Sequence, residues 1–190
     1  MSTAPSPSLR RVRAQDAPAV LTAFDSHPDM ARQGDVTSLV DAQRYVDRLI
    51  APDSPHEAWA VVAGDELVGL VCVSVDEDNL SGWFWYWMSA SARGRGWTAA
   101  AAATVAEWAL TARGLERLEL GHRANNPASG AVARHAGFVQ EGIERGKFLI
   151  DGQRVDVATY GRLRTDPRPT FAPMPMHGPV MTTRALMQRR

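Results

Sequence analysis

The spacing of hydrophobic positions divides the chain into segments of two kinds. Short apolar or alternating runs between turn residues are typical of strands, and apolar residues three or four positions apart are typical of helices. The pattern predicts strands at 9–13, 57–63, 67–76, 83–87, 115–121, 138–150 and 155–163, and helices at 16–27, 38–50, 99–112 and 126–137. This order of elements predicts a mixed sheet with helices on its faces, which is an α/β fold.

Turn residues and local composition indicate where the folded domain begins and ends. Gly64-Asp65-Glu66 and Asp151-Gly152-Gln153 are each expected to join the two strands of a hairpin. Residues 1–8 are rich in Ser, Pro and Ala and are predicted to be mobile. Residues 165–190 are rich in Pro and Met without clear periodicity, so disorder is favoured over a tail that wraps a neighbour. The domain is therefore placed at 9–164.

A glycine-containing loop lies at the centre of the chain. The aromatic strand at 83–87 leads into Arg93-Gly94-Arg95-Gly96-Trp97-Thr98, and an alanine-rich helix follows. The glycines permit a tight turn, while the start of the helix directs unpaired amides and the positive end of its dipole to the same point. Such a loop can bind anionic oxygens, and Arg93 and Arg95 add two cations able to pair with phosphate.

Two common glycine-loop motifs do not fit this loop. The phosphate-binding loop of nucleoside triphosphatases needs Lys and Ser or Thr after its last glycine, and Trp97-Thr98 stands there. The dinucleotide-binding fingerprint needs a third glycine and a place near the start of a βαβ unit, and the sequence has neither. A plain solvated turn is the remaining alternative, but the setting between a strand and a long helix favours an anion site.

Charge and composition narrow the class of protein. The 190 residues are enough to bury about 70% of the unfolded surface. Lys+Arg and Asp+Glu both number 21, which argues against nucleic acid or membrane as a partner, because either needs a basic excess. The one cysteine, Cys72, lies in an apolar run and is expected to be a buried, inert thiol. Because no apolar run reaches membrane-spanning length and residues 1–13 lack a signal-peptide core, we expect a cytoplasmic protein.

Several short motifs in the second half of the chain occur together at separations typical of one enzyme family. They are Trp85-Tyr86-Trp87-Met88, Arg93-Gly94-Arg95-Gly96, Gly114-Leu115-Glu116-Arg117-Leu118-Glu119-Leu120, Asn126-Pro127-Ala128-Ser129, Ala136-Gly137-Phe138, Glu141-Gly142 and Asp151-Gly152. Through them, residues 82–163 resemble the GNAT superfamily of acyl-CoA-dependent N-acyltransferases, and within it the RimJ/RimL type that acetylates ribosomal-protein N-termini. The resemblance implies the GNAT fold, a largely antiparallel mixed sheet with a V-shaped splay and helices on both faces.

The resemblance also implies acetyl-CoA as co-substrate, without a metal, and gives places for its parts. The pantetheine arm is expected in the splay, paired with strand backbone near Met88 and Ser89. The pyrophosphate is expected at Arg93, Gly94, Arg95, Gly96, Trp97 and Thr98. The Asn126 side chain is expected near the pantetheine amide, unless it only caps its helix, and the Ser129 hydroxyl near the thioester sulfur. Relatives usually carry Gln or Arg where Ser91 stands, so one phosphate contact is missing.

The familiar catalytic side chains of such relatives are absent. RimI-type enzymes have a glutamate base and a tyrosine acid, and RimL-like enzymes a further glutamate. Those places hold Gly121, Ala133 and Phe148. Ser129 is then the candidate acid, directly or through water. Glu119 shares a strand face with position 121 and is the candidate base through a water chain, with an ion pair to a neighbouring arginine as the alternative; His122 is expected to face the other way.

The absence of a strong base affects which amine can be the acceptor. An α-amino group with a pKa near 7.8 is about one tenth neutral at pH 7, whereas a lysine near 10.4 is only about 0.04% neutral. A protein N-terminus, an amino acid or an amino-sugar is therefore favoured over a lysine side chain. The acceptor pocket is expected between the first two helices, the aromatic strand and the last hairpin, with Trp85 and Tyr86 in its wall.

Three functions remain open after this reasoning. The leading one is acetyl transfer from acetyl-CoA to a protein N-terminal amine, by direct attack in a ternary complex. The second is a small-molecule N-acyltransferase that acts on an antibiotic, a polyamine or an amino acid. The third is an acyl-CoA-binding module without catalysis, which the residues at 121, 133 and 148 suggest. The acyl-chain preference and the oligomeric state stay open, and a homodimer is among the states the sequence permits.

Overall fold

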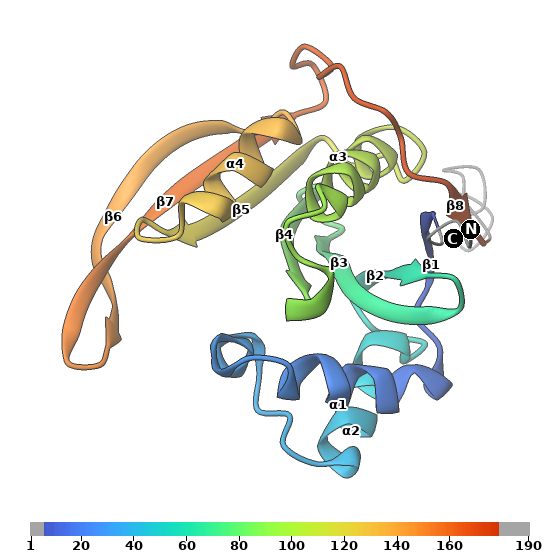
Figure 1. Cartoon of the computed structure of the whole chain (residues 1–190). Coiled ribbons are helices and arrows are strands. Elements are labelled where there is room, and N and C mark those ends of the chain that lie inside the picture. Colours follow the sequence, from blue (N-terminus) through green and yellow to red (C-terminus); the bar gives the residue numbers. More distant parts are fainter. Residues whose placement is uncertain (1–5, 179–190) are drawn as a thin grey trace.

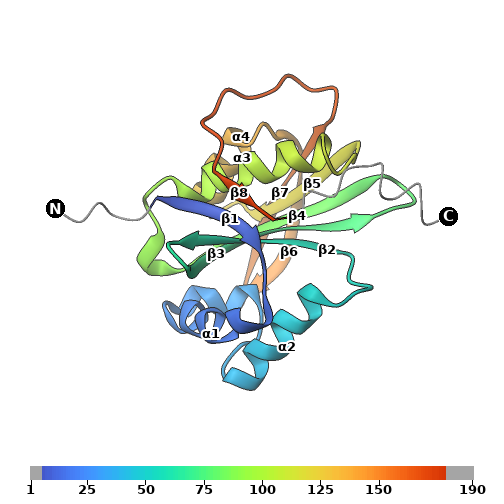
Figure 2. The ribbon, with the colours of Figure 1, turned by 90° about the vertical axis from the view of Figure 1, so that its right-hand side faces the viewer.

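In residues 6–178, the part of the chain that the computed structural model describes, one sheet lies between two layers of helices (Figure 1). The strands are β1 (Pro7–Arg11), β2 (His56–Ala63), β3 (Glu66–Asp76), β4 (Ser81–Met88), β5 (Arg117–Arg123), β6 (Val139–Ile150), β7 (Gln153–Leu163) and β8 (Met176–His177). The α-helices are α1 (Ala17–Asp25), α2 (Leu39–Ile50), α3 (Trp97–Leu110) and α4 (Pro127–His135). The strand order is β6-β7-β5-β4-β3-β2-β1-β8. Helices α1 and α2 cover one face, and α3 and α4 the other (Figure 2).

The helices and strands predicted from hydrophobic spacing are all present, with ends that differ by a few residues. The expectation of mobility for residues 1–8 is wrong for Pro7 and Ser8, because both pair with β2; residues 1–5 lie outside the described part. Short 3₁₀ helices, η1 (Ala14–Asp16), η2 (Pro28–Gln33) and η3 (Ala90–Ala92), were not predicted. Of these, η2 matters most, because it lies beside the cavities described below.

The two central strands, β4 and β5, stay together at one end only. Their parallel pairing runs from Ser81 opposite Arg117 to Trp83 opposite Glu119. Beyond Trp83, β4 continues to pair with β3 as far as Met88, and β5 continues to pair with β7. The strands therefore diverge, as Figure 1 shows, and this confirms the V-shaped splay.

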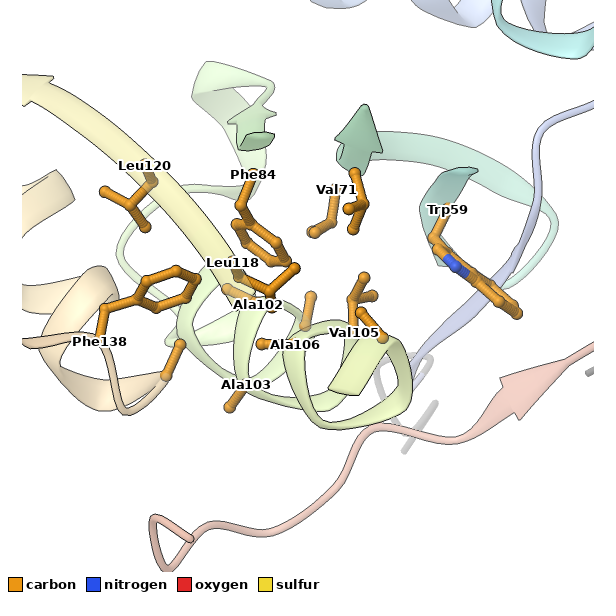
Figure 3. Packing of buried hydrophobic residues seen from close by; sticks show 14 of the residues in the cluster. Trp59, Val71, Phe84, Ala102, Ala103, Val105, Ala106, Leu118, Leu120 and Phe138 are labelled. Carbon is orange, nitrogen blue, oxygen red and sulfur yellow. The ribbon is translucent and has the colours of Figure 1, made fainter. Parts of the chain in front are cut away.

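The larger core cluster lies between the sheet and α3. This helix is apolar on nearly all sides because the sheet, α4 and the C-terminal segment surround it. Its fully buried alanines are Ala101, Ala102, Ala103, Ala106 and Ala109. Their small side chains let the helix lie close to the sheet, and Figure 3 shows Ala102 and Val105 among Phe84, Leu118 and Val71. The start of α3 is thereby held beside the end of β4.

The segment after β7 is ordered as far as residue 178, contrary to the expectation of disorder for 165–190. It crosses α3, where Met174 is buried and its amide donates to Thr104 Oγ1 at 2.9 Å (Figure 2). Strand β8 then pairs in parallel with β1, and the Leu9 amide donates to the Pro175 carbonyl at 2.7 Å. Such isolated anchors have no periodicity, so the pattern did not reveal them. Residues 179–190 lie outside the described part.

Candidate active site

The loop before α3 has the geometry of an anion site. Gly94 and Gly96 have φ values of 74° and 75°, a left-handed conformation that favours glycine. A Cβ built on either glycine would meet no atom within 4 Å, so both border open space. Within the described residues, no protein acceptor is found for the amides of 94–99, and the first backbone bond of the helix runs from the Ala100 amide to the Gly96 carbonyl at 3.1 Å. These amides are free of protein partners in the described chain, and their use as an anion site stays a prediction.

A cleft of about 530 Å³ opens above this loop. We call it the loop cavity. Besides the loop, its walls come from η2, from the end of β4 at Met88, and from the first turn of α4 at Asn126 and Ser129. Residues 94–98, Met88, Asn126 and Ser129, all predicted as cofactor-binding, are therefore brought together around one space.

Arg93 does not serve as the free phosphate ligand that the sequence suggested. Its two terminal nitrogens donate to the Asp29 carboxylate at 2.8 and 2.9 Å, and its Nε donates to the Met88 carbonyl at 3.0 Å. Hydrogen bonding to Arg93 lowers the pKa of Asp29 below its ordinary value. The arginine thus ties η2 to the end of β4. Arg95 differs, because its guanidinium lies over the Trp97 ring at 5.0 Å and has no carboxylate partner in the described chain.

Ser89 is also less available than expected. Its amide donates to the Val68 carbonyl at 2.9 Å, and its hydroxyl lies 3.2 Å from that of Ser91. The residue is buried and does not line the loop cavity, so its backbone N–H cannot pair with pantetheine. Met88 does line the cavity, and the β4 edge beyond Trp83 has no strand partner on the β5 side.

A second cavity of about 330 Å³ occupies the splay itself. We call it the aromatic cavity. It is lined by residues 83–86 of β4, residues 120–123 of β5, residues 148–150 of β6, and Arg32 and Gln33 of η2. Trp85 and Tyr86 both line it, as predicted for the acceptor pocket, and the Trp85 indole N–H is satisfied by Ser74 Oγ at 3.0 Å. The predicted contribution of the first two helices comes instead from η2, which connects them.

The two cavities meet at a common boundary. The residues that line both are Arg32, Gln33, Tyr86, Arg123, Asn126 and Ser129. Asn126 caps α4 by accepting from the Ser129 amide at 3.2 Å, and its side-chain amide donates to Ser129 Oγ at 3.1 Å. The Tyr86 hydroxyl donates to the Ser129 carbonyl at 3.1 Å, and burial raises the pKa of Tyr86 to about 12. Ser129 is therefore fixed from two sides, between the two cavities.

The structure does not bring Glu119 to this boundary. Its carboxylate accepts from Arg117 Nε at 2.7 Å, and the residue lines neither cavity. The ion pair considered for it from sequence is therefore what the chain forms, and a base role at this site is not supported. His122 faces the opposite way, as expected, with Nδ1–H donating to the Arg123 carbonyl at 2.9 Å. Its Nε2 is buried against Gly130 without a partner in the described chain, although His122 is among the residues that line the aromatic cavity.

Of the three positions where relatives were expected to carry catalytic side chains, two line the aromatic cavity and one lies in the core. Gly121 lines the aromatic cavity, and a Cβ on it would lie 3.3 Å from the Trp83 ring. Ala133 is buried in the core, whereas Phe148 lines the aromatic cavity. Sequence reasoning missed Arg32, Gln33 and Arg123, which come from an unpredicted 3₁₀ helix and the end of a strand. No local pattern marks such residues as neighbours.

Three further features of the described residues are the environment of the cysteine, the grouping of possible metal ligands, and the length and hydrophobicity of the helices. Cys72 is fully buried, and burial raises the pKa of its thiol, as expected of an inert core cysteine. In residues 6–178 there is no group of three or more His, Cys, Asp or Glu side chains that could hold a metal ion. Over the same range, no helix has the length and apolar character needed to cross a membrane.

Comparisons with solved structures show the same fold in several acetyltransferases. The chain is similar in structure to the ribosomal-protein α-N-acetyltransferase RimL in complex with coenzyme A, with 24% identity, a TM-score of 0.72, and coverage of 85% of this chain and 95% of that one. It is also similar to a spermidine N-acetyltransferase chimera of Vibrio cholerae SpeG and hSSAT, with 20% identity, a TM-score of 0.74, and coverage of 84% and 96%. A third similar structure is the microcin self-immunity acetyltransferase MccE with acetyl-CoA and AMP, at 17% identity, a TM-score of 0.72, and coverage of 83% and 92%.

Sequence comparison gives the family. A search of curated proteins gave no match. The family model of the acetyltransferase (GNAT) domain, however, matches residues 8–139, which is well over half of the chain. The chain therefore belongs to the GNAT family of acetyl-CoA-dependent N-acetyltransferases.

Proposed function

We propose that this enzyme acetylates the α-amino group of a protein N-terminus by direct attack within a ternary complex. The observation that carries the proposal is the boundary at Ser129, where a cleft with available amides meets a second cavity with an aromatic wall. One cavity can hold the acyl donor and the other the amine. Holding both reactants in line can contribute about 7 to 11 kcal/mol to the rate.

The loop cavity fits the donor by the chemistry of its walls. The amides of 94–99 and Arg95 would hold the pyrophosphate, and the unpaired edge of β4 near Met88 would pair with the pantetheine arm. Asn126 caps its helix and also faces the cavity, so both roles considered for it are compatible. When bound, acetyl-CoA supplies an activated carbonyl and a thiolate leaving group.

Ser129 is the group proposed to relay a proton to that leaving group. As the N–C bond forms and the C–S bond breaks, its hydroxyl gives its proton to the thiolate, and it regains one from the nitrogen of the attacking amine. Its Oγ accepts a hydrogen bond from Asn126, which leaves its own proton free to donate, since no acceptor for it is found in the described chain. Tyr86 is neutral at physiological pH, as an ordinary tyrosine is, and burial raises its pKa further. Its hydroxyl bond to the Ser129 carbonyl holds the first turn of α4 in place. Tyr86 is thus a positioning residue, and Ser129 the candidate acid.

The aromatic cavity favours an amine that needs no strong base. Among the described residues no Asp or Glu lines this cavity, and Nε2 of His122, a residue that does line it, is buried against Gly130. An α-amino group is about one tenth neutral at pH 7, so a useful fraction can attack without deprotonation by the enzyme. This supports an N-terminal acceptor over a lysine side chain.

A small amine is the second candidate acceptor. The aromatic cavity of about 330 Å³ lies within the size range of small-molecule sites, and Phe148 and its neighbours on β6 close one side of it. Similar structures carry both kinds of name, a ribosomal-protein acetyltransferase and a spermidine acetyltransferase. The third function, a module without catalysis, remains the alternative if no amine is acetylated.

Two measurements test the proposal. Calorimetry with CoA should give specific binding, and a thiol-release assay with acetyl-CoA should detect turnover with short N-terminal peptides but less with free amino acids or spermidine. Turnover with small amines alone would favour the second candidate. Tight CoA binding without thiol release from any amine would favour the binding module, and absence of CoA binding would refute the proposal outright.

A further inference from the structure

Two arginines stand where the cavities meet, and neither has a carboxylate partner in residues 6–178. Arg32 comes from the last turn of η2 and Arg123 from the end of β5, and both line both cavities. No ion pair or side-chain hydrogen bond is formed by either guanidinium within that range. Arg32 is exposed and Arg123 is half-buried. The other buried or half-buried arginines of residues 6–178 are paired; Arg117, for example, contacts both Glu119 and Glu141. The half-buried Arg123 therefore lacks the partner that such a group usually has, and Arg32 adds a second unpaired guanidinium to the walls of the same two cavities.

The charges around these arginines leave room for an anion. The aromatic cavity contains no Asp or Glu, and the carboxylate that lines the loop cavity, Asp29, is held in a two-bond contact by Arg93. Burial and the positive charge of Arg32 both lower the pKa of Arg123, while the negative charge of Asp29 raises it in part, so the electrostatic environment of Arg123 contains the second cation as well as the paired carboxylate. Their mutual repulsion would be relieved by an anionic group placed between them.

We propose that the acceptor carries a carboxylate close to its primary amine and that Arg32 and Arg123 bind this carboxylate while the amine lies at Ser129. The inference rests on the proposed function and adds the chemical class of the substrate. The carboxylate can come from an acidic residue near the N-terminus of a peptide or from a free amino acid. A polyamine such as spermidine would instead bring positive charge to a cavity boundary that already holds two unpaired cations.

A binding experiment tests this without requiring turnover. The full chain is saturated with CoA, which has no acetyl group to transfer, and is titrated calorimetrically with matched ligands. The peptide pair is Ala-Asp-Ala-Ala and Ala-Asn-Ala-Ala, the small pair is L-alanine and L-alaninamide, and spermidine is the cationic probe. Because hydrogen bonds to charged groups are strong, the carboxylate member of at least one pair should bind about 10- to 100-fold more tightly. Preference within the peptide pair identifies an acidic N-terminus, and preference within the small pair alone identifies an amino acid.

Variants assign the effect to the two arginines. Arg32→Gln and Arg123→Gln should each lower the carboxylate preference toward unity, with CoA affinity changed less than about threefold. The matched control is Arg134→Gln, which removes an exposed arginine from the helix that holds Ser129 but lines neither cavity; it should keep the full preference.

Several results would overturn the inference. In the titrations these are equal affinity within both pairs, no measurable binding of any carboxylate ligand, or tighter binding of spermidine than of the carboxylate ligands. In the variants they are a carboxylate preference that survives in both Arg32→Gln and Arg123→Gln, or a loss of CoA affinity as large as the loss of preference, which would assign the arginines to the cofactor. If CoA itself fails to bind the unmodified chain, the proposed function fails first. That outcome is separately visible because CoA saturation is measured before any acceptor is added.

Discussion

Replacing Gly96 by alanine should weaken CoA binding by an amount that the loop geometry sets. Gly96 is the N-cap of α3 with φ 75° and ψ −3°, and an alanine there adopts the left-handed region at a cost of about 1–2 kcal/mol. If the loop relaxes to avoid this strain, binding must restore the conformation, and CoA affinity should fall about 5- to 30-fold. If the loop does not relax, the added methyl enters the open space beside the amides, where phosphate oxygens would lie, and affinity falls as well.

The chain offers a closely matched control in Gly152. It has the same φ of 75°, and a Cβ on it would also meet no atom within 4 Å, but it lies in the turn between β6 and β7. Gly152→Ala should therefore carry a similar backbone strain, seen in urea unfolding, while CoA affinity by calorimetry changes less than twofold. Unchanged CoA affinity in Gly96→Ala would refute the assignment of the loop. An equal loss of affinity in both variants would mean that general destabilisation, and not the loop, is responsible.

Three further predictions follow from single contacts. Ser129→Ala should lower kcat about 100-fold or more with CoA affinity nearly unchanged; equal kcat would remove Ser129 from the mechanism. Thr104→Val deprives the buried Met174 amide of its acceptor and should cost about 1–3 kcal/mol in urea unfolding, unless the segment is not docked in solution. Arg93 lowers the pKa of Asp29, so the pair stabilises fully above pH 3.8 and loses its effect as pH falls through the lowered pKa. The unmodified protein should be more stable in urea unfolding than Asp29→Asn above pH 3.8, and this difference should shrink only as the pH falls below 3.8. A difference that shrinks already above pH 3.8 would contradict the prediction.

The parts of the site that sequence could predict are those encoded by neighbouring residues. Gly94 and Gly96 signal a left-handed turn whatever surrounds them, and Asn126 followed by proline signals the start of a helix. Both features place backbone amides, and backbone geometry is determined locally. For this reason the left-handed turn at Gly94 and Gly96 and the cap at Asn126 were predicted at the residues where the structure has them, while the anion that the loop would bind stays a prediction.

The parts that sequence could not predict depend on contacts between distant segments. Arg93 was assigned to phosphate because its own loop suggested it, but Asp29, 64 positions earlier, occupies its guanidinium. The Glu119 carboxylate could be read equally as a base or as an ion-pair partner, and only the position of Arg117 beside it decides. Arg32 carries no local signal at all, because its role follows from where η2 lies against the splay.

The same contacts explain why the chain has glycine where related enzymes are described as having a glutamate base. A Cβ at position 121 would lie 3.1 Å from Val157 Cγ1 and 3.3 Å from the Trp83 ring, so a glutamate there requires both neighbours to shift slightly. Trp83 in turn forms part of the aromatic cavity. This strand position therefore contributes no carboxylate, and the charged groups that line both cavities are the arginines of η2 and β5. A site built in this way favours orientation of an already neutral amine over its deprotonation, which is consistent with an α-amino acceptor whose own pKa lies near neutrality.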